Sequence, residues 1–209
     1  MHIPDGILNM PVLITTNLIS ASVLVPAINK VNRQLSVKRI PLMGLSAAFV
    51  FTVQMLSFPV PGGTSVHISG ALLISVLLGP LSGTLITTSA VLMQALLFQH
   101  GGLLAIGANI LNIAIAQSLL AYYLYRLMPG SRKQLSIGLA ALLGKLLGGA
   151  LLSFQLYFAD AISAEKLNAS LAAILGSQLI GGIIEGLVIG SIFMLILRVR
   201  PDIIEMEKI

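Results

Sequence analysis

Residues 170–197 read SLAAILGSQLIGGIIEGLVIGSIFMLIL, an apolar run with a single charged side chain, Glu185. About 20 apolar residues in a helix are enough to cross the hydrocarbon core of a bilayer. The rest of the chain has the same character, because 56% of its 209 residues are apolar and 9% are charged. A soluble domain carries about 25% charged residues. The sequence therefore predicts an all-α integral membrane protein.

Seven apolar segments are expected to form transmembrane helices of one membrane-embedded domain, residues 1–209. The segments are 11–29, 41–57, 68–78, 81–98, 103–125, 137–158 and 170–197. The loop cations follow the first, fifth and seventh segments and include Lys30, Arg33, Lys38, Arg39, Arg126, Arg132, Lys133, Arg198, Arg200 and Lys208. Seven crossings put all of them on one side, which the positive-inside rule assigns to the cytoplasm. We expect the N-terminus outside and the C-terminus inside, and the net charge of +5 needs no nucleic-acid partner.

Several chemistries have no residues to support them. The chain has no Cys, which excludes thiolate metal sites and disulfides. It has neither a phosphate-binding loop nor an H-E-x-x-H motif, so it is expected to be neither an ATPase nor a zincin-type protease. A signal peptide is not visible before the first apolar segment, and we expect Met1 to be retained at the mature N-terminus.

The third segment, 68–78, spans only about 16 Å as a helix, half of a bilayer core of about 30 Å. The stretch before it, PVPGGTSVH at 59–67, contains two prolines and two glycines and cannot be regular helix. Irregular backbone at membrane depth is tolerated where protein buries it or it lines a cavity. We expect this loop to dip inward with His67 at its deepest point, within reach of an extended N-terminal tail of about 20 Å.

A metal chelate is available at the start of the chain, which reads MHIPDG. The amine of Met1, the backbone nitrogen of His2 and Nδ1 of His2 can close two chelate rings on one ion. The imidazole of His67 would complete a plane of four nitrogens. Such planar sites favour Ni(II) or Cu(II). As alternatives, His2 is an ordinary tail residue and His67 is a loop residue satisfied by backbone carbonyls.

Four stretches carry a resemblance to a known family. They are MHIPDG (1–6), FPVPGGTSVHISG (58–70), HGGLLAIGANILN (100–112) and GGIIEG (181–186). Together they resemble the cobalt/nickel substrate-binding subunits of energy-coupling factor (ECF) transporters, with a lean towards the nickel type. The cobalt type belongs to cobalamin-synthesis clusters.

The resemblance implies a first helix added to a six-helix bundle, with Met1, His2 and His67 as metal ligands. It implies Ni(II) or Co(II) as the transported substrate, no catalytic residue and no catalytic cofactor. It also implies partners: a transmembrane coupling subunit, cytoplasmic ATPases and often a small accessory membrane subunit. The expected location is the plasma membrane of a prokaryote, with the lipid bilayer as surroundings.

Other polar residues have two interpretations each. Gln54, Ser65, Asn109 and Asn112 are candidates to accept a hydrogen bond from the free ring nitrogen of His67, and plain helix–helix hydrogen bonding is the alternative. We expect Lys145 and Glu185 to form a buried ion pair between the sixth and seventh segments, with a proton or ion path through Glu185 as the alternative. His100 is expected to be a solvated turn residue rather than a metal contact at the entrance.

The sequence leaves two rival functions open. One is a stand-alone secondary metal carrier or channel that needs no ATPase. The other is an intramembrane hydrolase built on Ser65 and His67, although no carboxylate lies near them in sequence.

Overall fold

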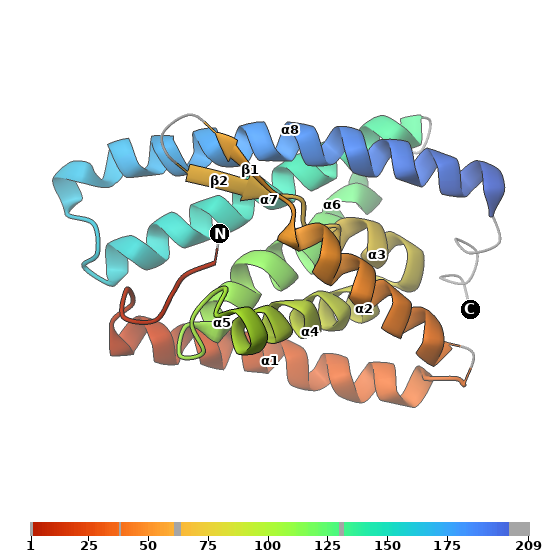
Figure 1. Cartoon of the computed structure of the whole chain (residues 1–209), viewed down its shortest axis with the longest axis horizontal. Coiled ribbons are helices and arrows are strands. Elements are labelled where there is room, and N and C mark those ends of the chain that lie inside the picture. Colours follow the sequence, from red (N-terminus) through yellow and green to blue (C-terminus); the bar gives the residue numbers. More distant parts are fainter. Residues whose placement is uncertain (1, 38, 61–63, 130–131, 201–209) are drawn as a thin grey trace.

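The computed structural model describes residues 2–37, 39–60, 64–129 and 132–200, and within them nearly every element is helical (Figure 1). The elements are α1 Met10–Gln34, α2 Arg39–Met55, β1 Ser57–Val60, β2 Thr64–His67, α3 Ala71–Leu78, α4 Pro80–Phe98, α5 Ile106–Asn109, a π-helical stretch Ile110–Leu120, α6 Ala121–Leu127, α7 Lys133–Phe158, a 3-10 turn Ala164–Lys166 and α8 Leu167–Val199.

Each of the seven predicted apolar segments coincides with a helix, but the helices differ in length. Five are long and apolar enough to cross a membrane: α1, α4, the continuous run Ile106–Leu127, α7 and α8. Helix α2 has 17 residues and α3 has eight. The chain is therefore a multi-pass membrane protein with five candidate spans in its described part, and seven crossings with the N-terminus outside stay a prediction.

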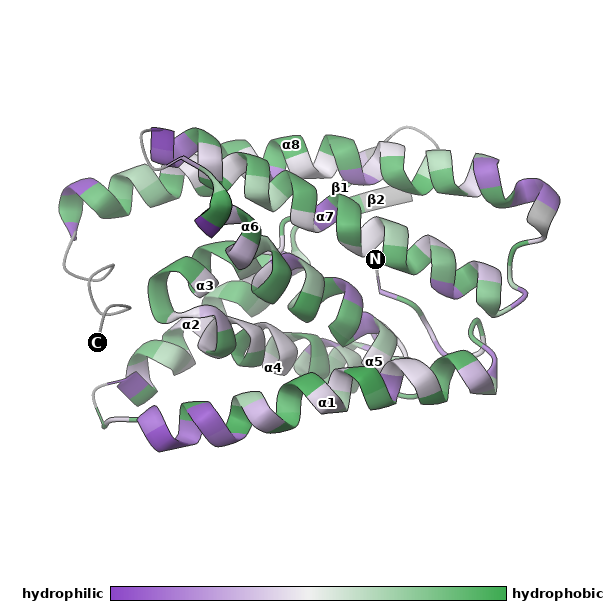
Figure 2. Cartoon of the chain, turned by 180° about the vertical axis from the view of Figure 1, so that it is seen from behind, coloured by the Kyte–Doolittle hydropathy of each residue, from purple (hydrophilic) through white to green (hydrophobic). Residues whose placement is uncertain are grey.

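The outer faces of the long helices are suited to lipid. Leu18 of α1 is 65% exposed and Leu187 of α8 is 66% exposed. Figure 2 shows hydrophobic residues along the middle of these two helices and hydrophilic residues gathered towards their ends. Exposed apolar surface of this extent marks an interaction with a membrane or a partner rather than with water.

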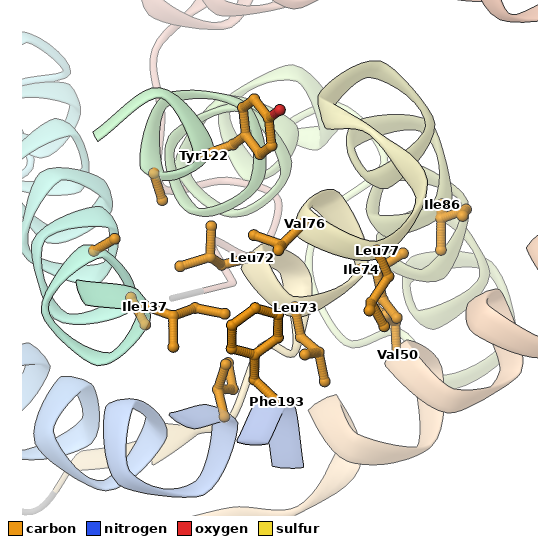
Figure 3. Packing of buried hydrophobic residues seen from close by; sticks show 14 of the residues in the cluster. Val50, Leu72, Leu73, Ile74, Val76, Leu77, Ile86, Tyr122, Ile137 and Phe193 are labelled. Carbon is orange, nitrogen blue, oxygen red and sulfur yellow. The ribbon is translucent and has the colours of Figure 1, made fainter. Parts of the chain in front are cut away.

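Helix α3 forms the centre of the core, because residues 71–77 are all buried. Leu72, Leu73 and Val76 pack with Ile137 of α7 and Phe193 of α8 (Figure 3). A helix that is apolar on all sides is stable only when other elements surround it. The short third segment predicted from the sequence is thus a buried central helix. It fixes the position of the segment that precedes it, residues 57–70.

That loop is a β-hairpin, which the sequence did not predict. Strands β1 and β2 pair antiparallel with Ser57 opposite His67 and Phe58 opposite Val66. Val66 packs against α8, where a Cβ added at Gly181 would lie 2.9 Å from the Val66 Cβ. Gly70 then takes a left-handed φ of 64° and turns the chain into α3. The described parts of the segment that was expected to be irregular, residues 59–60 and 64–67, are therefore strand, and His67 is the last residue of β2.

Helix α1 packs against α5 through a close approach at Gly107. A Cβ at Gly107 would lie 2.4 Å from the Cα of Asn17. The Asn17 side chain accepts from Gly107 N at 3.1 Å, and Ser20 Oγ donates to Gly107 O at 2.7 Å. These contacts fix the start of α1 beside the loop after α4, and so determine where the residues before α1 can lie.

Candidate metal centre

The N-terminal tail, residues 2–9, turns back from the start of α1 into the bundle (Figure 1). The side chain of Asn109 holds it by the main chain of Ile3: Ile3 N donates to Asn109 Oδ1 at 2.7 Å, and Asn109 Nδ2 donates to Ile3 O at 3.0 Å. Gly102 N donates to the same Ile3 carbonyl at 2.8 Å. Ile3 is only 3% exposed. The residue next to His2 is therefore fixed inside the protein.

Asp5 provides the second anchor of the tail. Its carboxylate accepts from the backbone N–H groups of Leu103, Leu104 and Ala105 at 3.0, 2.9 and 3.1 Å. These donors precede α5, where the free N–H groups and the helix dipole favour a negative charge. A Cβ at Gly102 would lie 1.9 Å from Asp5 Oδ1, so the approach needs glycine at this position.

Three imidazoles meet at the end of the tail. The ring centroid of His2 lies 5.2 Å from that of His67 and 4.3 Å from that of His100. Both ring nitrogens of His2 and both of His67 are buried and have no hydrogen-bond partner in the described structure. Buried polar atoms normally have partners. Four such nitrogens at one place indicate a site for an electrophile, and a metal ion is the usual one for imidazole.

The imidazoles outside the helices are held in the neutral, metal-binding form. Burial is the main reason that the pKa of His2 is lowered to about 2. Burial also lowers the pKa of His100 from its ordinary value. Among the described residues, no three His, Asp or Glu side chains are arranged to hold one ion.

The predicted partners of His67 lie elsewhere. Asn109 bonds to the tail, as described above. Asn112 pairs with Gln155 of α7 through two hydrogen bonds of 2.8 and 2.9 Å. Gln54 Nε2 donates to Ser69 O at 3.2 Å. None of these three bonds to a ring nitrogen of His67. Asn109 and Asn112 have other partners, and the Oε1 of Gln54 is itself without a partner in the described structure. Met1 and the side chain of Ser65 lie outside the described residues.

Lys145 and Glu185 form the expected ion pair, and both side chains are 2% exposed. The pair also anchors the segment after β2. Lys145 Nζ donates to the carbonyl of His67. Glu185 Oε1 accepts from the Ser69 hydroxyl and from Gly70 N, the latter at 3.3 Å. Every charged atom of the pair thus has a local partner, and the geometry supports an anchor for His67 rather than a path for protons.

Sequence reasoning missed three contributors to this site: Asp5, Ser69 and Gln155. The role of Asp5 could have been predicted from the sequence. An acidic residue in the tail can bond to backbone N–H groups of the loop that contains Gly101 and Gly102, because these glycines leave room for the tail. Ser69 and Gln155 had none, because a single Ser or Gln in an apolar segment has many ways to be satisfied.

The chain's class follows from these features, since long apolar helices enclose unpaired imidazoles: it is a membrane protein that handles a metal ion. Residues 2–203 match the family described as the cobalt uptake substrate-specific transmembrane region, CbiM. The chain belongs to this family of membrane proteins for cobalt uptake.

Individual relatives agree with that assignment. The crystal structure of a transition metal transporter has a TM-score of 0.87 and 32% identity, covering 95% of this chain and 93% of that one. The cobalt transport protein CbiM of Geobacter sulfurreducens is 38% identical over 67% of this chain and 40% of its own length. The fused nickel transport protein NikMN of Rhodobacter capsulatus is 37% identical over 69% of this chain and 43% of its own length.

A double-mutant cycle tests the anchor formed by the ion pair. Lys145→Met and Glu185→Gln each leave one buried charge without its partner, and each is expected to lower the free energy of unfolding by about 3 kcal/mol or more. The double variant should lose about 0.5–3 kcal/mol less than the sum. Unfolding of the metal-free protein in mixed micelles measures this. Lys30→Met, at an exposed cation of α1, is the control and should change stability by about 0.5 kcal/mol at most. Additive losses would contradict the pairing.

Proposed function

We propose that this chain is the substrate-binding subunit of an ECF-type transporter and that it captures Ni(II) or Co(II) in a plane of four nitrogens. The ligands would be the amine of Met1, the amide nitrogen and Nδ1 of His2, and a ring nitrogen of His67. The observation that carries the proposal is the set of buried, unpartnered ring nitrogens on His2 and His67, whose centroids are 5.2 Å apart. Elsewhere among the described residues, no group of three or more His, Asp or Glu side chains is arranged to hold an ion.

The chemistry of the donors supports a planar site. Consecutive nitrogens of one peptide chain close five- and six-membered rings and so lie near one plane, which suits Ni(II) more than zinc, magnesium or calcium. The two anchors of the tail, Asn109 and Asp5, hold His2 before the ion arrives. A site that is already ordered loses less conformational freedom on binding. Cobalt remains in the proposal because relatives carry both metal names.

Transport is proposed to depend on partners. We place the capture site on the outer side, in line with the cations expected in the cytoplasm. A transmembrane coupling subunit and cytoplasmic ATPases would reorient the loaded chain in the plasma membrane of a prokaryote, and a small accessory membrane subunit is a further candidate partner. This chain would then contribute recognition of the ion and no chemistry of its own.

Adding one residue before Met1 tests the proposed ligand set. The addition keeps every side chain but moves the amine away from the ion and breaks the chelate ring. Nickel affinity is expected to fall by about a hundredfold or more, since even residues that only support a metal ligand contribute ten- to a hundredfold. Isothermal titration of the purified protein measures it. One residue added at the C-terminus is the matched control, and equal affinity in the two proteins would rule out the amine as a ligand.

Reconstitution of this chain alone tests the need for partners. In vesicles that contain a nickel-sensitive dye, we expect nickel to bind the protein but the dye signal to stay at the level of protein-free vesicles. The reason is that the ring nitrogens of His2 and His67 are buried and the chain has no motif for ATP hydrolysis. A nickel ionophore added at the end confirms that the dye responds. Net uptake by the chain alone would contradict the proposed dependence on ATPases.

A further inference from the structure

His100 does not behave as the solvated turn residue expected from sequence. Helix α4 ends at Phe98, Gln99 adopts a left-handed φ of 53°, and His100 N donates to Gln94 O at 3.1 Å. Gly101 follows with φ 100°. This tight turn directs the His100 ring against that of His2, with centroids 4.3 Å apart, closer than His2 is to His67.

The three imidazoles differ in burial. His67 is 6% exposed, and both ring nitrogens of His2 are shut off from solvent. His100 is half-buried and is the least enclosed imidazole of the three. His2 lies between the other two, since its ring contacts both. The three imidazoles thus form a series from the surface to the interior.

His100 is poorly placed to be a permanent third ligand. The three side chains are not arranged to hold one ion together. Moreover, the tail that carries His2 is fixed by Asp5 and Asn109, which limits how far the His2 ring can shift. A residue that touches the His2 ring but does not share an ion with both other imidazoles can contact the ion before or after it occupies the inner site.

We propose that His100 is the first protein ligand of the entering divalent cation and passes it to His2 and His67. This inference rests on the proposed function and extends it by naming the entry step. A hydrated divalent cation must lose its waters before it reaches a buried site, and this loss is the expensive part of entry. The imidazole of His100 can replace one bound water before the ion reaches His2, so the ion is never without donors. The same contact can form in reverse when the ion is released.

An entry ligand has a kinetic signature that a structural residue or a permanent ligand lacks. It lowers the barrier from both directions and leaves the end states unchanged. In His100→Gln, association and dissociation of nickel are expected to slow by about tenfold each, while the dissociation constant stays within about twofold of wild type. Stopped-flow mixing and isothermal titration measure these quantities. Leu97→Ala, in the last turn of α4 and 62% exposed, is the matched control with wild-type rates.

A second variant tests direct contact with the ion. The chain has no cysteine, so His100→Cys introduces a unique thiolate ligand. During nickel loading we expect a thiolate-to-metal charge-transfer absorbance that appears early and decays as the ion moves inward. Loading without this transient, or wild-type rates in His100→Gln, would overturn the inference.

The outcomes separate this inference from the proposed function. A weaker dissociation constant in His100→Gln with an unchanged association rate would make His100 a permanent ligand and overturn the entry role. If the wild type binds nickel and the variants match it, the entry role falls and the proposed function stands. If the wild type binds neither nickel nor cobalt, both fall.

Discussion

Insertion of the N-terminal tail into the helix bundle is the interaction on which the candidate site depends. The carboxylate of Asp5 accepts hydrogen bonds from three backbone N–H groups that precede α5. The side chain of Asn109 bonds to both the N–H and the carbonyl of Ile3. Without these bonds, a short polar tail would gain more from water than from an apolar interior. The tail carries His2 to its place, and the glycines after His100 leave room for it.

The segment that carries His67 is held by the same kind of hydrogen bond. Polar side chains of the surrounding helices bond to the main chain of the non-helical segment rather than to the imidazoles. Lys145 donates to the His67 carbonyl, Gln54 donates to the Ser69 carbonyl, and Glu185 accepts from Gly70 N. Irregular backbone in an apolar interior needs such partners. These networks leave the ring nitrogens of His2 and His67 unpaired, and a metal-binding site requires unpaired nitrogens.

Much of this architecture follows from the sequence. Local patterns predicted the seven apolar segments, including the short third one, and the irregular stretch before it. The structure has helices at these segments, a buried short helix at the third and a β-hairpin before it. The approach of His2 to His67 was also predictable, because both lie in non-helical segments that were expected on the same side. Pairing of Lys145 with Glu185 followed from the cost of leaving either charge alone in an apolar segment.

The parts that were not predicted depend on long-range geometry. The pairing of β1 with β2 could not be predicted from the sequence, because each strand has only four residues and only the turn residues between them indicate a hairpin. Asn112 was assigned to His67, but its amide is complementary to that of Gln155 across two helices, and no local pattern reveals such a match. His100 was expected in solvent. The left-handed turn at Gln99, which determines the orientation of the His100 ring, is not apparent from the sequence.

X-ray absorption spectroscopy of the nickel-loaded protein decides whether four nitrogens hold the ion. We predict four nitrogen ligands in a planar, low-spin Ni(II) site, and loss of one imidazole from the spectrum in His67→Ala. Six-coordinate nickel surrounded by oxygen and nitrogen, with a spectrum that His67→Ala leaves unchanged, would contradict it.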